Sequence, residues 1–289
     1  MTQWIVAALP LLVVLVMTIV GMDLRAADFL RVRRHPVLVP AIVIGQWVAL
    51  TLVAGLVGRL LDMPQAVAGG ALLVAAAPVA TLSNYYTQLA RGHLALAVTV
   101  TAVSNALAPL ATPLVAAIGF GLFLEESAAF ALPLATVARQ AAAGLLLPLL
   151  AGMLIRHRAP AWTTRWRARL QVLSLLAIAV VFVAVVADQF EAIRDRFAIY
   201  LGASAAFTAA MLATGLLVAR LAVRSAEDRR ALVWGFPARN FAVATLIATA
   251  AVGQAQMLSF AAVLFATQIA VLVPLGWRLG RRSGERRAA

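Results

Sequence analysis

The chain has 289 residues, of which 64% are hydrophobic, and its mean hydropathy is +0.96. A soluble globular domain is about 45–50% apolar. This composition therefore excludes a soluble domain and predicts an integral membrane protein. The net charge of +13 does not indicate a nucleic-acid partner, since no basic face with an aromatic platform accompanies it, and the absence of cysteine excludes disulfides and thiolate metal sites.

In chain order, nine segments are long and apolar enough to cross a bilayer, which takes about 20 residues. They are residues 3–22, 36–60, 65–90, 93–118, 129–155, 170–187, 197–219, 230–252 and 256–277. We interpret Met1 to Gly21 as the first span. A signal peptide cleaved near Ala26 and Ala27 is the alternative, which the long apolar run without a basic leader disfavours.

Two of these segments, 65–90 and 230–252, contain helix-breaking and polar residues in the middle. The first reads PVATLSN from Pro78 to Asn84, and the second reads GFPARN from Gly235 to Asn240. Polar, broken backbone at membrane depth is tolerated only where it faces protein or a water-filled cavity. A pair of such breaks, one in each half of the chain, indicates the binding site of a transporter.

The connectors between the spans alternate in charge. Those after spans one, three, five, seven and nine carry an excess of arginine, whereas the others are acidic, mixed or uncharged. The positive-inside rule therefore places the N-terminus outside and the C-terminus in the cytoplasm. We expect a multi-pass protein of the inner (cytoplasmic) membrane, surrounded by membrane lipids. A missed span would invert every later connector, so the alternation supports the count of nine.

The positions of the two breaks indicate an inverted repeat. One lies in the third of the first four spans, and the other in the fourth of the last five. The halves align as inverted copies if the first has lost a leading helix, and inverted repeats are a common plan of secondary transporters. We expect repeats at residues 1–119 and 128–279 and a cytoplasmic tail at 280–289.

Residues 77–113, APVATLSNYYTQLARGHLALAVTVTAVSNALAPLATP, resemble the bile acid:sodium symporter family. The similarity extends to Gly-Met-Asp-Leu from Gly21, His35-Pro36, Gln46, and the stretch from Pro148 to Gly152. The resemblance implies an all-α polytopic fold of two inverted five-helix repeats, here without the first helix. It also implies a panel of spans one, five and six beside a core in which the two broken helices cross.

The same resemblance implies two sodium sites at the crossing. Ser83, Asn84 and Thr101 match ligands of the first site, and Gln46 matches a ligand of the second. A serine expected four residues before Thr101 is Ala97 here.

At the second break the chain departs further from the family pattern. Gly235 stands where a glutamate is expected to serve both sites, and Arg239 stands where a glutamine ligand is expected. Like charges about 4 Å apart repel by several kcal/mol at an effective dielectric near 20, so this second site opposes sodium. Our hypothesis is that Arg239 is a tethered cation in the place of the second ion. Alternatively, Arg239 binds the anionic group of the substrate. A third alternative is that its side chain snorkels to the membrane interface and belongs to no binding site.

The remaining polar residues near the breaks have structural alternatives. Ser83, Asn84 and Asn240 are good helix caps as well as candidate ligands, and Gln46 fits a structural and a site role equally. Thr101 is on the same helical face as Ser104 and Asn105, where hydrogen bonds between helices are the common role, and we assign a site role only to Thr101. The predicted substrate-binding residues are Thr81, Asn84, Arg239 and Asn240, and the predicted ion-binding residues are Gln46, Ser83, Asn84, Thr101 and Arg239.

These observations predict a secondary transporter that moves an organic anion, a carboxylate, by alternating access, with sodium coupling weakened or lost. No motif of an enzyme is present, no cofactor beyond sodium at a reduced first site is expected, and no obligate protein partner is inferred. Coupling to protons through a buried carboxylate is disfavoured, because no Asp or Glu falls near the middle of a span. The alternatives are a membrane sensor or scaffold that does not transport, and an arsenite-type metalloid efflux carrier, although such carriers rely on a membrane cysteine.

Overall fold

The computed structural model of the chain describes residues 3–124, 139, 142–248 and 255–288. Within these ranges every regular element is helical, and the strand-like pairing is limited to an isolated antiparallel bridge between Val79 and Arg239. This agrees with the predicted class of an all-α polytopic membrane protein.

The helices of the described ranges follow one another along the chain with short connections. They are α1 (Gln3–Asp23), α2 (Ala26–Leu30), the 3₁₀ turn η1 (Arg31–Arg34), α3 (Leu38–Leu60), α4 (Gln65–Ala76), α5 (Leu82–Leu89), α6 (Leu94–Phe123), the π-helical turn η3 (Ala142–Leu146), α8 (Leu147–Arg158), α9 (Pro160–Asp188), α10 (Phe190–Asp195), α11 (Phe197–Ala222), α12 (Ala226–Val233), α13 (Phe241–Leu246) and α14 (Ala255–Ala288).

Five of these helices are long and apolar enough to cross a membrane alone, and a bent pair, Pro10–Asp23 with Ala27–Arg34, makes a sixth if it counts as one span. The two interrupted segments are divided into helices too short to qualify singly, and the predicted span 129–155 lies partly outside the described residues. The count of nine therefore stays a prediction.

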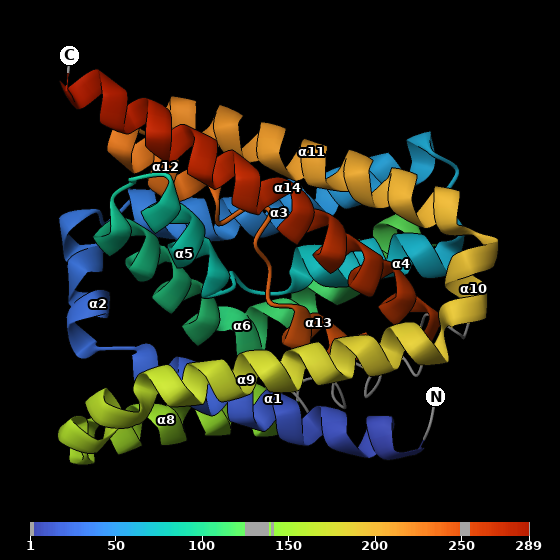
Figure 1. Cartoon of the computed structure of the whole chain (residues 1–289), viewed down its shortest axis with the longest axis horizontal. Coiled ribbons are helices and arrows are strands. Elements are labelled where there is room, and N and C mark those ends of the chain that lie inside the picture. Colours follow the sequence, from blue (N-terminus) through green and yellow to red (C-terminus); the bar gives the residue numbers. More distant parts are fainter. Residues whose placement is uncertain (1–2, 125–138, 140–141, 249–254, 289) are drawn as a thin grey trace.

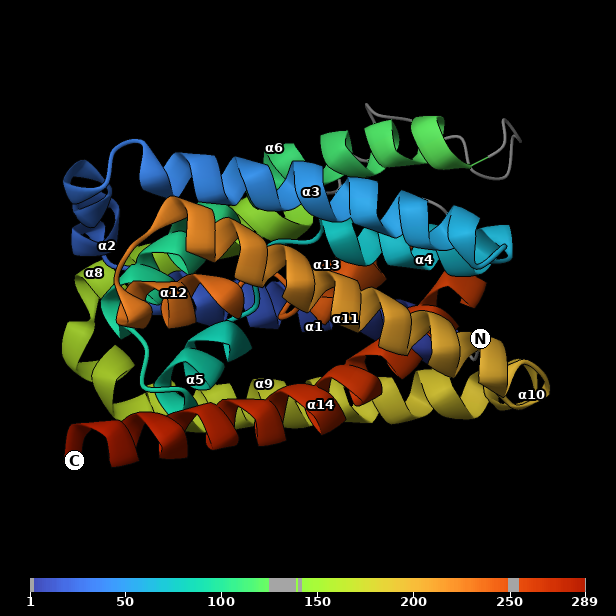
Figure 2. The ribbon, with the colours of Figure 1, turned by 90° about the horizontal axis from the view of Figure 1, so that it is seen from above.

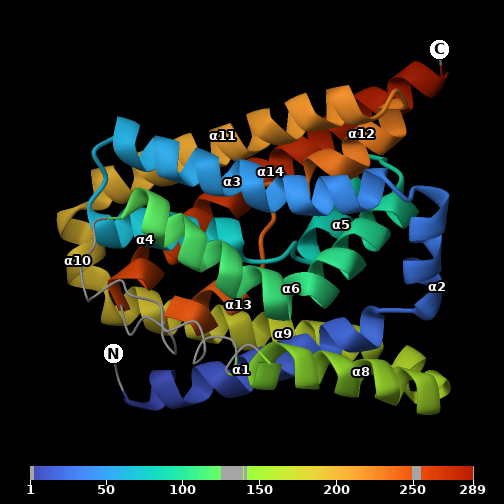
Figure 3. The same ribbon diagram turned by 180° about the vertical axis from the view of Figure 1, so that it is seen from behind.

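The helices form two bodies that lie side by side. Figure 1 shows α1, α8 and α9 as a layer along one side of the molecule, and the view from behind in Figure 3 agrees. We call this layer the panel, and we call α3–α6 with α11–α14 the core. Within the core, α4 packs against α3, α6 and α14, and α11 packs against α3 and α14. Figure 2 shows the long helices α3, α9, α11 and α14 running along the same long axis.

Both interruptions predicted from the sequence are places where a helix ends. In the first, α4 ends at Ala76, and Ala77 is extended at φ −63° and ψ 152°, because a residue before proline avoids the α region. In the second, α12 ends at Val233, and α13 begins after Asn240, whose Oδ1 accepts from the Val243 N–H at 3.3 Å. The side chain of Asn240 thus caps the second half-helix.

The two extended stretches cross each other inside the core. The N–H of Ala80 donates to the Ala238 carbonyl at 2.8 Å, and the N–H of Asn240 donates to the Pro78 carbonyl at 2.8 Å. These two bonds satisfy backbone groups that the broken helices leave without a helical partner.

Helix α6 supports the crossing with two side chains. The Ser104 hydroxyl accepts from the Val79 N–H at 3.1 Å, and the Asn105 amide donates to the Val79 carbonyl at 2.9 Å. Both side chains are buried, so they supply the hydrogen bonds that the N–H and carbonyl of Val79 would otherwise have to form with water.

The Ala-Arg-Gly turn connects α5 to α6 and leads into His93, which contacts the second broken segment. Arg91 has φ 53°, and the N–H of Gly92 donates to the Thr87 carbonyl at 2.8 Å, which ends α5. The His93 ring then lies 2.7 Å from a carboxylate oxygen of Asp228 on α12. The start of α6 is therefore attached to the first turn of α12.

Candidate functional site

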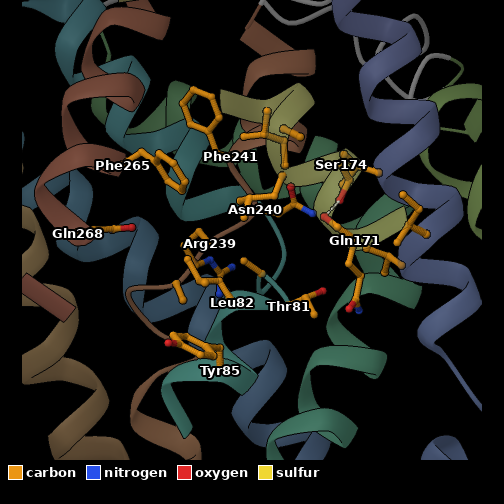
Figure 4. A pocket seen from close by; sticks show the side chains of 18 of the residues that line it. Thr81, Leu82, Tyr85, Gln171, Ser174, Arg239, Asn240, Phe241, Phe265 and Gln268 are labelled. Carbon is orange, nitrogen blue, oxygen red and sulfur yellow. Dashed lines mark hydrogen bonds between the residues drawn. The ribbon is translucent and has the colours of Figure 1, made fainter. Parts of the chain in front are cut away.

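A cavity of about 280 Å³ lies between the panel and the core, beside the crossing. Residues of α1 and α9 form its panel wall, and the crossing, α5, α13 and α14 form its core wall (Figure 4). Most of the wall is apolar, including Val16, Ile19, Val20, Leu175, Ile178 and Ile269. Its size is close to the lower end of ordinary small-molecule sites.

Five neutral polar side chains also belong to this wall. Thr81 and Asn240 come from the crossing, Gln171 and Ser174 from α9, and Gln268 from α14 (Figure 4). The Oδ1 atom of Asn240 caps α13, which leaves its NH₂ group as the hydrogen-bonding group for a ligand. Gln171, Ser174 and Gln268 donate to Asp23, to the Gln171 carbonyl and to Met211, so the donors for a ligand come from Thr81 and Asn240. Two such donors in an apolar wall suit a ligand with one polar end.

The two ends of the cavity differ. At one end Phe182 of α9 meets Phe241 of α13 and Phe265 of α14, with ring centroids 5.3 to 6.4 Å apart. At the other end are Asp23, the last residue of α1, and Tyr85, whose side chain is 50% exposed. The phenylalanines join the panel to the core at this end of the cavity.

Arg239 and Gln46, both predicted at the second ion site, lie together inside the core. Arg239 is 4% exposed and Gln46 is 1% exposed. The Nη1 atom of Arg239 donates to Gln46 Oε1 at 3.3 Å and to the Gly235 carbonyl at 3.3 Å. Its Nη2 atom donates to the Ala75 carbonyl at 3.2 Å and also to the Ala77 carbonyl. Arg239 borders the cavity, but its terminal nitrogens face protein oxygens.

The three residues predicted at the first ion site also lie together. The hydroxyls of Ser83 and Thr101 are 3.4 Å apart, and the Thr101 hydroxyl donates to Asn84 Oδ1 at 3.2 Å. The amide of Asn105, one turn further on α6, donates to the Thr101 carbonyl, and its own Oδ1 is buried without a partner in the described structure. Asn84 is therefore beside Thr101 and does not line the cavity, although we predicted a contact with the substrate.

Gln171, Ser174 and Gln268 were missed as wall residues by the sequence analysis. Gln171 and Ser174 are three apart on α9 and share one helical face, which is the signal that could have identified them. A single glutamine such as Gln268 gives no such signal, because a lone amide in an apolar span commonly bonds a neighbouring helix.

Comparisons with known proteins are consistent with this arrangement. Residues 10–196 match the model of the Sodium Bile acid symporter family. The chain is 31% identical over 190 residues to the "Uncharacterized sodium-dependent transporter YocS" of Bacillus subtilis, a match that covers 65% of this chain and 57% of that protein. It is 42% identical over 72 residues to the "Probable sodium/metabolite cotransporter BASS1, chloroplastic" of Arabidopsis thaliana, covering 25% of this chain and 18% of the plant protein. The match thus spans little more than half of YocS and a smaller part of the plant protein.

Proposed function

Because the chain belongs to the sodium bile acid symporter family, we propose that it is a secondary transporter that carries a small organic anion across the cytoplasmic membrane by alternating access. The observation that carries this proposal is the cavity between panel and core, lined by both bodies beside the crossing of two broken helices. Transporters place their substrates at such discontinuous helices, where free backbone groups are available.

The substrate that best suits the wall is an amphipathic monocarboxylate. Its apolar part would lie against the aliphatic side chains of α1 and α9, and its carboxylate would accept from the neutral donors of Thr81 and Asn240. The first turn of α5 begins beside Thr81 and presents the positive end of a short helix. With the fork of Arg239 engaged by protein oxygens, a bidentate arginine clamp is not part of this proposal.

Alternating access is supported by the asymmetry of the cavity. In this proposal the phenylalanine cluster closes its end of the cavity. The other end, where α1 finishes at Asp23, lies toward α2, α12 and the C-terminus (Figure 1). The arginine-bearing connectors lie toward that second end, which favours its being cytoplasmic. The proposed state is therefore open to the cytoplasm, in a chain of nine spans with inverted repeats at 1–119 and 128–279.

Sodium enters the proposal through the first site only. Ser83, Asn84 and Thr101 present oxygens to one another, and the orphaned Asn105 Oδ1 shows that acceptor capacity is left over in this region. Hard cations prefer oxygen ligands of this kind. A sodium ion held by these three residues would supply positive charge next to the start of α5.

A ligand screen followed by a flux measurement tests the proposal. Purified full-length protein is heated with a panel of monocarboxylates, each beside its neutral amide analogue, in sodium chloride and in choline chloride. We expect an amphipathic monocarboxylate to raise the melting temperature by about 3–8 °C, since ligand at 100 times Kd stabilises by about 2.7 kcal/mol, and its amide not to do so.

The carboxylate that binds is then supplied in radiolabelled form to liposomes containing the protein. We expect liposomes that contain the protein to take up the carboxylate and protein-free liposomes not to do so. Equal stabilisation by the amide would contradict the anion selectivity, and binding without any flux would identify a sensor in place of a carrier.

A further inference from the structure

Two half-helices end inside the core with carbonyl groups that no further turn of helix can satisfy. Helix α4 ends at Ala76 and is followed by extended backbone, whereas α12 ends at Val233 and is followed by a turn that includes Gly235. The last four carbonyls of a helix lack helical donors and carry the negative end of its dipole. Buried carbonyls of this kind need donors or a cation, because water is excluded.

The guanidinium of Arg239 supplies both hydrogen-bond donors and a positive charge to these carbonyls. The two terminal nitrogens of Arg239 carry four N–H groups, and four oxygens accept from them. Three of these oxygens are main-chain carbonyls, of Ala75 and Ala77 at the end of α4 and of Gly235 just after α12. The fourth is the side-chain oxygen of Gln46 from α3. Each terminal N–H thus has one acceptor, and the ends of both half-helices meet at one positive charge.

The charge of Arg239 is balanced by dipoles and not by an acid. The described ion pairs include no carboxylate bonded to Arg239, and its side chain is almost completely buried. A cage of carbonyl oxygens from unwound backbone and from the C-terminal ends of half-helices is the environment that transporters offer to a monovalent cation. Here the cage surrounds a residue of the protein.

We infer that Arg239 is a resident cation that fills the place between the two half-helices where a mobile monovalent cation would otherwise be required. The positive charge is covalently attached to the core, so it is present in every state of the protein and cannot be released to either side. No cation gradient can then do work through this place. If the chain is the carrier proposed above, at most one sodium ion, at the first site, accompanies each substrate.

Chemical rescue tests the inference without any substrate. In the full chain, Arg239→Ala empties the cage, and we expect a melting temperature several degrees below that of the wild type in choline chloride. About 10 mM guanidinium chloride, a concentration far below the denaturing range, should restore most of this loss by occupying the cage. The wild type should gain nothing from guanidinium, and it should bind no more than one sodium ion per chain, counted with radioactive sodium.

Arg59→Ala is the matched control. Arg59 also donates to a main-chain carbonyl, that of Leu122 at 3.1 Å, but it does so at the exposed surface near the end of α3. Guanidinium should not stabilise this variant. Should Arg239→Ala fail to fold, Arg239→Lys replaces it, because an ammonium has three donors for the four oxygens and should leave a smaller loss that guanidinium does not repair.

Two results would overturn the inference: two bound sodium ions per wild-type chain, or an Arg239→Ala variant as stable as the wild type in choline chloride. Both readouts are made without a carboxylate. An error in the transport proposal would therefore appear only in the ligand screen and the flux assay. An error in the assignment of Arg239 as a resident cation would appear only in the melting temperatures and the sodium count.

Discussion

At the scale of single residues, the structure depends on buried polar groups that satisfy the broken backbone. Asn105 on α6 donates to the carbonyls of Val79 and Thr101, and it is 1% exposed. On the same helix Thr112 is also fully buried, but in the described structure its hydroxyl bonds neither protein backbone nor side chain. The two residues therefore allow a direct comparison of a bonded and an unbonded polar group.

We expect Asn105→Leu to destabilise the protein by about 1–3 kcal/mol, because two buried carbonyls lose a donor while the side-chain volume is nearly kept. Thr112→Val should change the stability by less than about 0.5 kcal/mol or increase it, since no bond is lost. Thermal unfolding of both variants in detergent is the measurement. Equal losses in the two variants would show that Asn105 does not support the crossing.

The sequence predicted which residues gather at the crossing better than it predicted what they do there. Proline, glycine and polar residues in apolar spans identified both breaks, because the bilayer tolerates such residues only against protein or water. The alternatives for Arg239 stayed open, since the sequence does not reveal which oxygens a buried guanidinium faces. Its acceptors lie in α3, α4 and the loop after α12, far apart along the chain.

At the scale of helices, the panel depends on close packing of α1 against α8. A Cβ atom on Gly152 of α8 would collide with the Thr18 carbonyl of α1 and lie 2.8 Å from the Met22 nitrogen. Gly21 approaches the Leu149 carbonyl in the same way. Small residues that let two backbones approach are a common basis of helix association in membranes.

We predict that Gly152→Ala destabilises the protein by about 1–3 kcal/mol, because the backbone of α1 must move away. Gly45→Ala on α3 is the control, since a Cβ atom there meets nothing within 4 Å. That variant should be neutral or gain up to about 1 kcal/mol from helix propensity. Melting temperatures of the two proteins check this, and a stable Gly152→Ala protein would refute the close approach of α1 and α8.

Helix boundaries show where hydropathy is a poor guide to structure. Helix α9 begins at Pro160, ten residues before the predicted span, through an arginine-rich stretch that is too polar for the bilayer but still helical. Helix α12 begins at Ala226, because the Ser225 hydroxyl accepts from the N–H groups of Glu227 and Asp228. Apolar length predicts the part of a helix inside the membrane, whereas capping groups decide where the helix begins.

At the scale of the whole molecule, the cavity has walls from two bodies, and aromatic side chains from both bodies meet at one of its ends. Phe182 belongs to the panel, while Phe241 and Phe265 belong to the core, so separation of the bodies at this end would open the cavity there. The sequence could not predict this pairing, because phenylalanines in three apolar spans carry no signal of which helix they meet.

The central claim, a cavity exposed to the two sides of the membrane in turn, is tested most directly by labelling single cysteines in this cysteine-free chain. Ser174→Cys places a thiol in the cavity wall, and Val172→Cys, on the same helix and 56% exposed at the protein surface, is the control that should face lipid. Liposomes containing either variant are treated with a membrane-impermeant maleimide from one side or the other, with and without Phe182→Ala.

We predict that the thiol of the Ser174→Cys variant reacts from both sides of the membrane. Its reaction from the side of the phenylalanine cluster should be slower until Phe182 is replaced by alanine. The thiol of the Val172→Cys variant should react from neither side. Reaction of the cavity-wall thiol from one side only, in both backgrounds, would contradict the account.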